Sequence, residues 1–476
     1  MTSKNKEEYS EITGLPSSFF LLNRTNYLNN LKLRFPQLNE NSIIALQGGC
    51  EQEKYDTDVD YYYFDQESNF YYLTGVRTPG LKAIIDIKTG DTTLYYSPLP
   101  NDYKIWMKVP TIEEIEKKYG IPTRDMNSFE TDISNRNPEN IYVIDGINEN
   151  SGTPVLTCEL NFKGELSYLN EKISHNKYIY MVLCDTRAVK NEEEIKLLKY
   201  IANISNEAHI QLMKFCKVGL NERDMENFFL QFLRDKYYTR FYAYNCICAT
   251  GSNGATLHYD LNNEDLKEND LFLTDMGIRF CGYVSDITTT FPVNGKFTDQ
   301  QKKIYDIVLK SNKEVIKSMK PGITRYIDMD ILSKKIILQG LKEIGILKED
   351  SDVDEMYDNR VWYYFMPHSV GHLVGLDVHD VGTKVSYKSL RLIEKGNFIT
   401  VEPGIYFIDL LMDQIENDPN LSKYVNKDVL ETYRGFGGVR IEDDVMVYDT
   451  KVESFQKDIP RTTEEIETFM KNNKYN

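Results

Sequence analysis

The chain has 476 residues, enough for two or three domains of ordinary size. Hydrophobic residues make up 41% and charged residues 27%, which is typical of a globular protein and excludes an intrinsically disordered one. The net charge is −17, so we expect neither a nucleic-acid partner nor a membrane partner, because binding to phosphates or to an anionic lipid surface relies on excess positive charge.

The first residues of the chain are polar and lack the apolar core of a secretory signal. No apolar run approaches the ~20 residues needed to span a bilayer. The 7 cysteines are scattered and show no Cys-x-x-Cys spacing, which is typical of free thiols in a reducing compartment. These features together predict a cytoplasmic protein.

The region from residue 40 to residue 150 alternates short apolar runs with turn residues. A helical pattern interrupts it at Ile112–Tyr119. We therefore predict a smaller N-terminal α/β domain over residues 1–185, with a candidate linker at Asp185–Lys190. The apolar runs are Ser42–Leu46, Asn69–Leu73, Ala83–Ile87 and Tyr142–Ile144.

A helical pattern follows the candidate linker. Asn191 with acidic residues after it is a typical helix start, and Ile195, Leu198 and Ile201 then fall on one face. This predicts a long amphipathic helix over residues 191–216, followed by a second over Asp224–Lys236. Strand-like segments carry most of the chemically informative residues beyond this point.

Histidine is scarce in the chain, yet three of the 6 histidines, His368, His372 and His379, fall within twelve residues. A single histidine is about as often a hydrogen-bonded core residue as a ligand. A cluster of a scarce residue indicates a functional site.

Two aspartates lie in apolar, strand-like runs. Asp275 ends the run Leu271–Asp275, and Asp286 lies in a β-branched run eleven residues later. Gly277 and Gly282 lie between them and favour a hairpin that would place both aspartates on paired strands.

Two glutamates lie in the same kind of context. Glu402 ends a strand-like run just before Pro403-Gly404. Glu442 alternates with Arg440 along another run, so the two should share one strand face. Any one of these acids alone reads equally well as a surface or ion-pair residue.

A set of four buried carboxylates requires compensating positive charge, because burying an unpaired charge is costly. Divalent metal ions supply that charge, and a carboxylate-rich ligand set with one imidazole favours Mn²⁺ or a similar ion. Two such ions roughly 3.5–4 Å apart can lower the pKa of a shared water and polarise a carbonyl group. The remaining histidines His258 and His379 are suited to stabilising an oxyanion.

At these residues the sequence resembles the pita-bread metallopeptidases, the family of methionine aminopeptidase, aminopeptidase P and prolidase. The order Asp, Asp, His, Glu, Glu matches position by position. The resemblance implies five metal ligands for two divalent ions per subunit: Asp275, Asp286, His372, Glu402 and Glu442. It further implies that Asp286 and Glu442 bridge the ions and that Glu402 also shuttles a proton.

Within that family the nearest resemblance is to the eukaryotic prolidase branch, and it covers nearly the whole chain. It implies an α+β fold in which a pita-bread catalytic domain, with an antiparallel sheet and outer helices, occupies residues 186–476. It also implies a homodimer, with the N-terminal domain of one subunit helping to close the other's site. The matching stretches are Leu22–Arg24, Leu46–Gly49, Ile204–His209, Cys246–Cys248, Leu257–Tyr259, Gly435–Glu442 and Pro460–Glu467.

The implied activity is hydrolysis of the Xaa-Pro bond in dipeptides that end in proline. By the same resemblance, His258 and His379 would contact substrate and stabilise the intermediate, Arg440 would orient the substrate, and Tyr244 would line the pocket.

The residue that would hold the proline carboxylate is open between two positions. Arg391 matches the family's local pattern but lies three residues closer to Glu402 than expected, whereas Lys388 matches by distance. We favour Arg391, because a planar guanidinium can bind a carboxylate with two hydrogen bonds.

Two alternatives to a dipeptidase remain at this stage. One is an Xaa-Pro aminopeptidase acting on longer peptides. The other is a catalytically inactive pita-bread binding module, which is disfavoured because all five ligand positions are filled.

Overall fold

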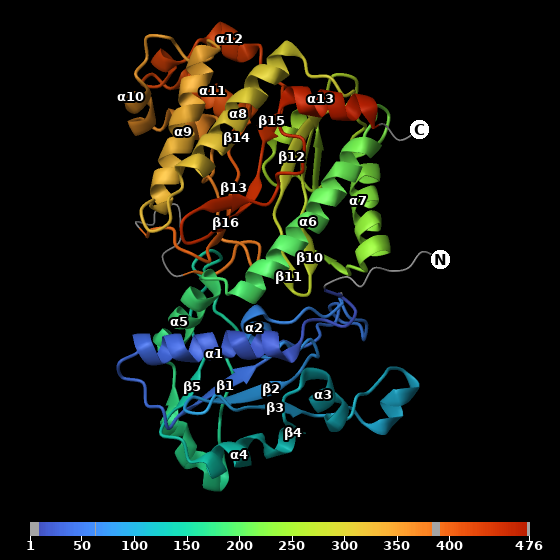
Figure 1. The fold of residues 1–476 in the computed structure, drawn as a ribbon, viewed down its shortest axis with the longest axis vertical. Coiled ribbons are helices and arrows are strands. Elements are labelled where there is room, and N and C mark those ends of the chain that lie inside the picture. The colour runs from blue at the N-terminus through green and yellow to red at the C-terminus, as the bar shows by residue number, and fades with distance from the viewer. Residues whose placement is uncertain (1–8, 62, 383–390, 474–476) are drawn as a thin grey trace. The chain divides into compact units, whose positions relative to one another are not determined.

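The structure is a computed structural model that describes residues 9–61, 63–382 and 391–473, and it divides into two compact units (Figure 1). Of the described residues, the first unit contains 9, 13–187, 381 and 382, and the second contains 10–12, 188–380 and 391–473. The division falls between Arg187 and Ala188. Helix α5 (Lys177–Ala188) therefore runs through part of the segment that the sequence marks as a linker.

The first unit is built on a mixed six-stranded sheet in the order β4-β3-β2-β1-β5-β6. Strand β1 pairs antiparallel with β2 and parallel with β5, which agrees with the α/β character predicted for this region. The strands are β1 (Ile43–Gln47), β2 (Lys82–Asp86), β3 (Thr92–Tyr96), β4 (Thr123–Asp125), β5 (Ile141–Val143) and β6 (Ile173–Ser174).

Both faces of this sheet are buried. Ile43 and Ala45 alternate with Ile44 along β1 and pack with Phe129 and Ile133 of α4 in one core. In Figure 1, α1 and α4 lie on opposite sides of strands β1–β3. The helices of this unit are α1 (Ser17–Arg34), α2 (Ser68–Thr74), α3 (Ile112–Tyr119), α4 (Phe129–Arg136) and α5.

Among the four apolar runs, Asn69–Leu73 differs from the other three because it is helical and forms most of α2. The cause is local. Glu67 precedes the helix and its side chain accepts a hydrogen bond from the Phe70 amide, while Gly75 ends it in the left-handed conformation. An N-cap and a C-cap with seven residues between them therefore outweigh the short apolar pattern.

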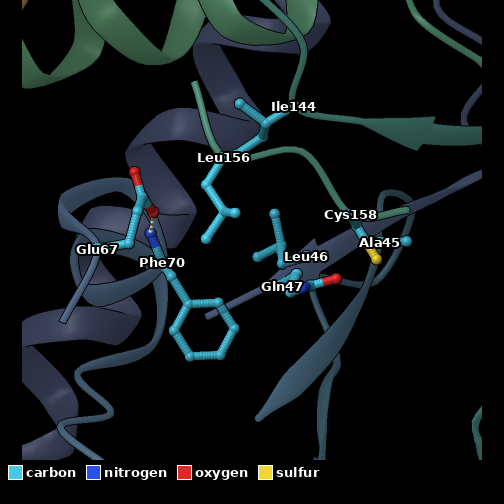
Figure 2. Close-up of a pocket in the computed structure, with 8 residues that line it drawn as sticks. All are labelled: Ala45, Leu46, Gln47, Glu67, Phe70, Ile144, Leu156 and Cys158. Atoms are coloured by element: carbon cyan, nitrogen blue, oxygen red, sulfur yellow. Dashed lines mark hydrogen bonds between the residues drawn. The ribbon is translucent and has the colours of Figure 1, made fainter. Parts of the chain in front are cut away.

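A small cavity beside β1 and α2 is shown in Figure 2. It has a volume of about 10 Å³, which is room for no more than one water molecule. The Glu67 carboxylate at its edge is occupied in capping α2, 2.7 Å from the Phe70 amide nitrogen. This cavity is therefore too small to bind a peptide.

The second unit contains antiparallel strand pairs. β9 lies between β8 and β12, β16 lies between β13 and β17, β10 lies between β7 and β11, and β14 pairs with β15. The strands are β7 (Phe241–Tyr242), β8 (Ile247–Thr250), β9 (Leu271–Asp275), β10 (Ile278–Phe280), β11 (Tyr283–Val284), β12 (Thr288–Pro292), β13 (Phe398–Val401), β14 (Gly404–Tyr406), β15 (Gly438–Arg440), β16 (Asp443–Val447) and β17 (Val452–Ser454).

Helices flank these strands on the outside, as predicted (Figure 1). The helix predicted over residues 191–216 is confirmed as α6, which is capped by Asn191 together with Glu194. The predicted second helix is confirmed within α7. The helices are α6 (Glu192–Phe215), α7 (Glu222–Tyr237), α8 (Asp299–Ser318), α9 (Tyr326–Glu343), α10 (Val353–Asp358), α11 (Asp409–Asn417), α12 (Lys427–Glu431) and α13 (Thr463–Asn472).

All seven cysteines are free thiols, and only Cys50 is exposed. Across the described residues, the structure contains no helix that combines the length and the apolar character required to cross a bilayer.

Candidate metal centre

The two aspartates of the predicted site lie at one end of the β9–β12 pair. Asp275 is the last residue of β9 and stands opposite Thr288 in β12. Asp286 precedes β12 by two residues, so it lies just outside the strand rather than within it. The short strands β10 and β11 pair with one another between the two aspartates, as an inner hairpin. The predicted pairing is therefore correct, whereas the placement of Asp286 on a strand is wrong.

The two glutamates are brought together by the β13–β16 pair. Glu402 directly follows β13, and Glu442 directly precedes β16. Because Val401 stands opposite Asp443, the residues after one strand and before the other lie at the same end. Pairing of segments forty residues apart in sequence thus places both carboxylates at one point.

His372 is fixed to the same strand by two backbone contacts. The Thr400 amide donates to the His372 carbonyl at 2.8 Å, and the His372 amide donates to the Thr400 hydroxyl at 3.0 Å. Its ring Nδ1 lies 3.1 Å from the Leu373 carbonyl and therefore carries the proton, which leaves Nε2 to face the carboxylates. Nε2 lies 3.4 Å from both Asp286 Oδ2 and Glu402 Oε1.

Three of these residues offer ligand atoms that all lie within 4.8 Å of one another: Asp286, His372 and Glu442. Glu402 contacts His372, and Asp275 shares a partner with Asp286. All five predicted ligands therefore converge, although they come from four separate segments of the chain.

The shared partner of the two aspartates is Tyr244. Its hydroxyl lies 2.5 Å from Asp275 Oδ1 and 2.5 Å from Asp286 Oδ1, so its single proton can be donated to either. The ring packs against Gly277, where a Cβ atom would lie 2.9 Å from the ring and 1.9 Å from the Ser285 carbonyl oxygen. Only glycine leaves room for this arrangement.

Arg440 lies behind Asp275 and is 4% exposed. Its guanidinium donates to Asp275 Oδ2 at 2.8 Å, to the Tyr406 hydroxyl at 2.9 Å and to the Thr288 hydroxyl at 3.1 Å. Thr288 in turn donates to Glu442 Oε2 at 2.7 Å. Arg440 and Glu442 thus share one side of their segment, as the alternation predicted.

Three of the four carboxyl groups, Asp275, Glu402 and Glu442, resist ionisation in this setting. Burial, reinforced by the charges of Asp286 and Glu402, raises the pKa of Glu442 well above its usual range. Burial also raises the pKa of Glu402 to about 7, although the charge of His372 opposes the shift. For Asp286, burial is the largest single effect and raises the pKa, but the hydrogen bonds from His372 and Tyr244 and the charges of His372 and His379 together outweigh it, so the pKa of Asp286 is lowered.

The imidazole of His372 responds in the opposite sense. Burial disfavours its charged form, but the hydrogen bond to Asp286 and the charges of Glu402 and Asp286 raise its pKa to about 9. The positive charges of His372 and Arg440 are therefore outnumbered by the buried carboxylates around them.

The donor set fits divalent cations. Glu442 is 1% exposed and Asp286 is 5% exposed, so water cannot solvate their charges. Carboxylate oxygens with one imidazole nitrogen are hard ligands for ions such as Mn²⁺, and bound cations would remove the repulsion that raises these pKa values.

The other predicted histidines lie at the edge of this cluster. The His379 ring centroid is 4.4 Å from that of His372, and burial, together with His372 and His258, lowers its pKa to about 4. His258 is exposed and lies near enough for its charge to act on both His379 and His368. A neutral His379 has one N–H to donate at neutral pH.

The two candidates for binding the proline carboxylate are not resolved by contacts. The guanidinium of Arg391 forms an ion pair with Glu394 three residues later. Lys388 lies outside the described residues. The role of either residue stays a prediction.

Three supporting residues were missed by the sequence analysis. Thr288 links Arg440 to Glu442, and the Tyr406 hydroxyl lies between Arg440 and His368 Nε2, 3.0 Å from the latter. Asp444 is fully buried and accepts from the Asp286 amide at 3.2 Å. Its place in an acidic triplet inside an apolar strand was a usable signal, whereas no local pattern marks the other two.

Models of two protein families match parts of this chain. A model of metallopeptidase family M24 matches residues 196–449, and a model of the aminopeptidase P N-terminal domain matches residues 20–142. The chain is similar to the Xaa-Pro dipeptidase of Rattus norvegicus, with 38% identity over 97% of this chain and 95% of that protein. It is 37% identical to the Xaa-Pro dipeptidase of Homo sapiens, with the same coverage of 97% and 95%. A probable Xaa-Pro aminopeptidase of Sordaria macrospora is 34% identical over 81% of this chain and 82% of that protein.

The chain is also similar in fold to solved structures of aminopeptidase P. A putative aminopeptidase P from Bacillus anthracis is 29% identical with a TM-score of 0.77, covering 97% of this chain and 100% of that one. Zinc-substituted aminopeptidase P of Escherichia coli in complex with product is 26% identical with a TM-score of 0.79, covering 97% and 100%. These similarities confirm the predicted α+β pita-bread architecture with a separate N-terminal domain.

Proposed function

Because this chain belongs to metallopeptidase family M24, we propose that it is an Xaa-Pro dipeptidase, a hydrolase that cuts the bond before a C-terminal proline. The observation that carries the proposal is the convergence of Asp286, His372 and Glu442, within 4.8 Å of one another, in a chain 37% identical to a dipeptidase along 97% of its length.

The family uses divalent metal ions. We place two in each subunit, held by Asp275, Asp286, His372, Glu402 and Glu442, with Asp286 and Glu442 shared between them. When bound, such ions lower the pKa of a water molecule and polarise the scissile carbonyl. The excess of carboxylate oxygens over nitrogen supports Mn²⁺ as the native ion.

The residues of the chain supply proton transfer and positioning. Glu402 is the proposed proton shuttle, and its Oε1 lies 3.4 Å from His372 Nε2 within the cluster. Tyr244 and Arg440 hold Asp275 in place. His258 and His379, at the edge of the cluster, are positioned to donate hydrogen bonds to the substrate carbonyl and to the developing oxyanion.

A second candidate is an Xaa-Pro aminopeptidase that accepts longer peptides. It is supported by the 34% identity to a probable Xaa-Pro aminopeptidase and by the similarity to aminopeptidase P structures. The two functions differ in whether the site requires a free carboxylate on the proline.

The experiment is hydrolysis of Gly-Pro and of a Gly-Pro-extended tripeptide by metal-stripped protein, with and without Mn²⁺. Metal-dependent cleavage of the dipeptide alone is the expected result. Cleavage of both would favour the aminopeptidase, and cleavage of neither with any divalent metal would contradict both. Asp286→Asn should be inactive, and Asp235→Asn on the exposed side of α7 is the matched control.

The carboxylate contact is tested with a substrate that lacks it. We propose that Arg391 binds the proline carboxylate, with Lys388 as the alternative. Arg391→Ala should raise KM for Gly-Pro and leave the slow hydrolysis of Gly-Pro-amide unchanged, because only the first has a carboxylate to bind. The same result with Lys388→Ala instead would transfer the role to Lys388.

We also propose that the enzyme is a homodimer in which the N-terminal domain of one subunit helps to close the other's site. An exposed apolar segment supports this association, since Ile105 is 79% and Trp106 is 81% exposed. Sedimentation of the wild type as a dimer and of Trp106→Asp as a monomer is expected, whereas a monomeric wild type would contradict the proposal.

A cytoplasmic location and a small peptide substrate complete the proposal, with neither nucleic acid nor membrane as partner. Seven free thiols and a net charge of −17 support these assignments. Cell fractionation, with the protein found among cytosolic markers, is the expected outcome.

A further inference from the structure

Glu222, the first residue of α7, is an unusual buried acid. It is 0% exposed, and its carboxylate accepts four hydrogen bonds, all from uncharged donors. Its position at the N-terminus of a 16-residue helix adds the favourable field of the helix dipole. The negative charge of Glu222 is therefore stabilised by uncharged hydrogen-bond donors and by the helix dipole.

All four donors lie in one continuous segment, from the last residue of β8 to Glu264. Oε1 accepts from the Thr250 amide at 2.7 Å and from Asn253 Nδ2 at 2.9 Å. Oε2 accepts from the Tyr259 hydroxyl at 2.7 Å and from the Glu264 amide at 3.0 Å. The carboxylate thus gathers both ends and the middle of residues 250–264, and His258 lies within that span.

The residues on either side of His258 are anchored while His258 itself is exposed. Tyr259 is 7% exposed and packs in a cluster with Tyr406, and Leu257 packs against the same cluster. The packing of Tyr259 and partly buried Leu257 fixes the backbone on both sides of His258.

The same loop is pressed against the strand that leads to Arg440. A Cβ atom on Gly437 would lie 2.0 Å from the Gly251 carbonyl oxygen, and one on Gly438 would lie 2.4 Å from the Gly254 carbonyl oxygen. The glycines of the Gly435–Glu442 stretch are therefore required for backbone contact with this loop, which is confined between Glu222 and β15.

We infer that Glu222 is a positioning residue that holds His258 at the metal centre. The inference rests on the proposed function only for the role of His258. It follows from geometry, because a single carboxylate can accept four hydrogen bonds whereas an amide in its place offers one oxygen and two additional N–H donors. Glu222→Gln keeps the shape of the side chain. Its amide N–H groups would, however, face the N–H and O–H groups that donate to the carboxylate in the wild type.

The test is a double-mutant cycle on Gly-Pro hydrolysis with wild type, Glu222→Gln, His258→Ala and the combination. We expect Glu222→Gln to lower kcat/KM by about 10–100-fold, because small displacements of a positioning group cost up to about 10²-fold. In the His258→Ala background the further loss should be below about 3-fold. Equal losses in both backgrounds would overturn the inference, since a general structural defect acts without His258.

Hydrogen–deuterium exchange provides a readout that does not depend on activity. Glu222→Gln should speed exchange in residues 250–264, and Asp235→Asn on the same helix should not. Unchanged exchange in Glu222→Gln would overturn the inference. A wild type that fails to cleave Gly-Pro would instead contradict the proposed function and leave this measurement to decide the role of Glu222.

A milder variant covers the case in which Glu222→Gln does not fold. Tyr259→Phe removes one of the four donors to Glu222, together with the contacts of the same hydroxyl with Asn253 and Asn263. It should show a smaller loss of kcat/KM that again disappears in the His258→Ala background, and a loss that persists there would overturn the inference.

Discussion

Two regions of the second unit bury acidic side chains in opposite ways. Lys190 and Asp380 form a pair with an Nζ–Oδ2 distance of 2.8 Å, and both side chains are 1% exposed. At the metal centre, Glu442 is equally buried, but its neighbours Asp286, Glu402 and Asp275 are acids too, and its own pKa is raised well above the usual range.

This difference in charge balance indicates the role of each region. In the Lys190–Asp380 pair the chain supplies both charges, so the pair is complete within the protein and serves packing. At the metal centre the chain supplies an excess of negative charge, which costs stability unless cations bind. Removing one charge should therefore destabilise the first region and stabilise the metal-free form of the second.

The largest expected effect is that of Glu442→Gln. It should lower kcat/KM for Gly-Pro by about 10⁴-fold or more, comparable to removal of a catalytic group in other hydrolases. The metal-free variant should nevertheless be more stable than the metal-free wild type at pH 8, because one buried, repelled carboxylate is gone. Steady-state kinetics and urea unfolding measure the two effects, and a less stable metal-free variant would contradict the comparison.

The next effect is expected for Lys190→Met, which removes the cation that pairs with the buried carboxylate of Asp380. We expect a loss of about 3–5 kcal/mol in the free energy of unfolding. The double variant Lys190→Met/Asp380→Asn should recover much of it, because no charge then remains unpaired. Urea unfolding of the three proteins tests this, and a double variant no better than the single one would refute it.

A smaller effect is expected for Tyr244→Phe, which removes the hydroxyl between Asp275 and Asp286. Loss of such a supporting hydrogen bond typically weakens metal binding by about 10–100-fold. Titration calorimetry with Mn²⁺ measures it. Tyr242→Phe, an exposed tyrosine in β7, is the matched control and should bind Mn²⁺ as the wild type does.

The last prediction is the pH dependence of the stability of the metal-free wild type. Glu402, with a folded pKa of about 7, and Glu442, raised further, keep protons that the unfolded chain releases near its value of 4.5. Their stabilising contribution is complete below that value and is lost as pH rises through the folded pKa. His372, with a pKa of about 9 against 6.5, loses its contribution in the same direction.

Stability of the metal-free protein should therefore fall from about pH 4.5, where the unfolded glutamates ionise, to about pH 9, where His372 loses its proton, by ~1.4 kcal/mol per pH unit for each proton retained. With saturating Mn²⁺ the stability should instead rise with pH, because the metal ion binds the ionised groups. Thermal unfolding at several pH values measures this. A metal-free protein that gains stability over the same range would show that the acids are not repelled.

Much of the candidate site was predictable because its proposed ligands stand in recognisable local sequence contexts. An acid at the end of an apolar run, as at Asp275 and Glu402, or a group of scarce histidines, as at His372, is visible in a short window of sequence. Supporting residues were not predictable in this way. Thr288 and Tyr406 are ordinary residues in their own segments, and their partners come from strands more than thirty residues away.

The same difference between local and long-range signals applies to the fold. Helix α6 was predicted nearly to its ends because its periodicity and its Asn191 cap are local. Asn69–Leu73, most of α2, was grouped with three apolar runs that form strands, because seven residues carry too little periodicity to separate helix from strand. The sequence alone determined the ligand types, their order and the amphipathic helices, since these depend on neighbours along the chain. Tertiary structure alone decided that Asp286 lies outside a strand, that Arg440 is bound to Asp275, and that Glu222 holds the His258 loop, because those contacts exist only once distant strands have paired.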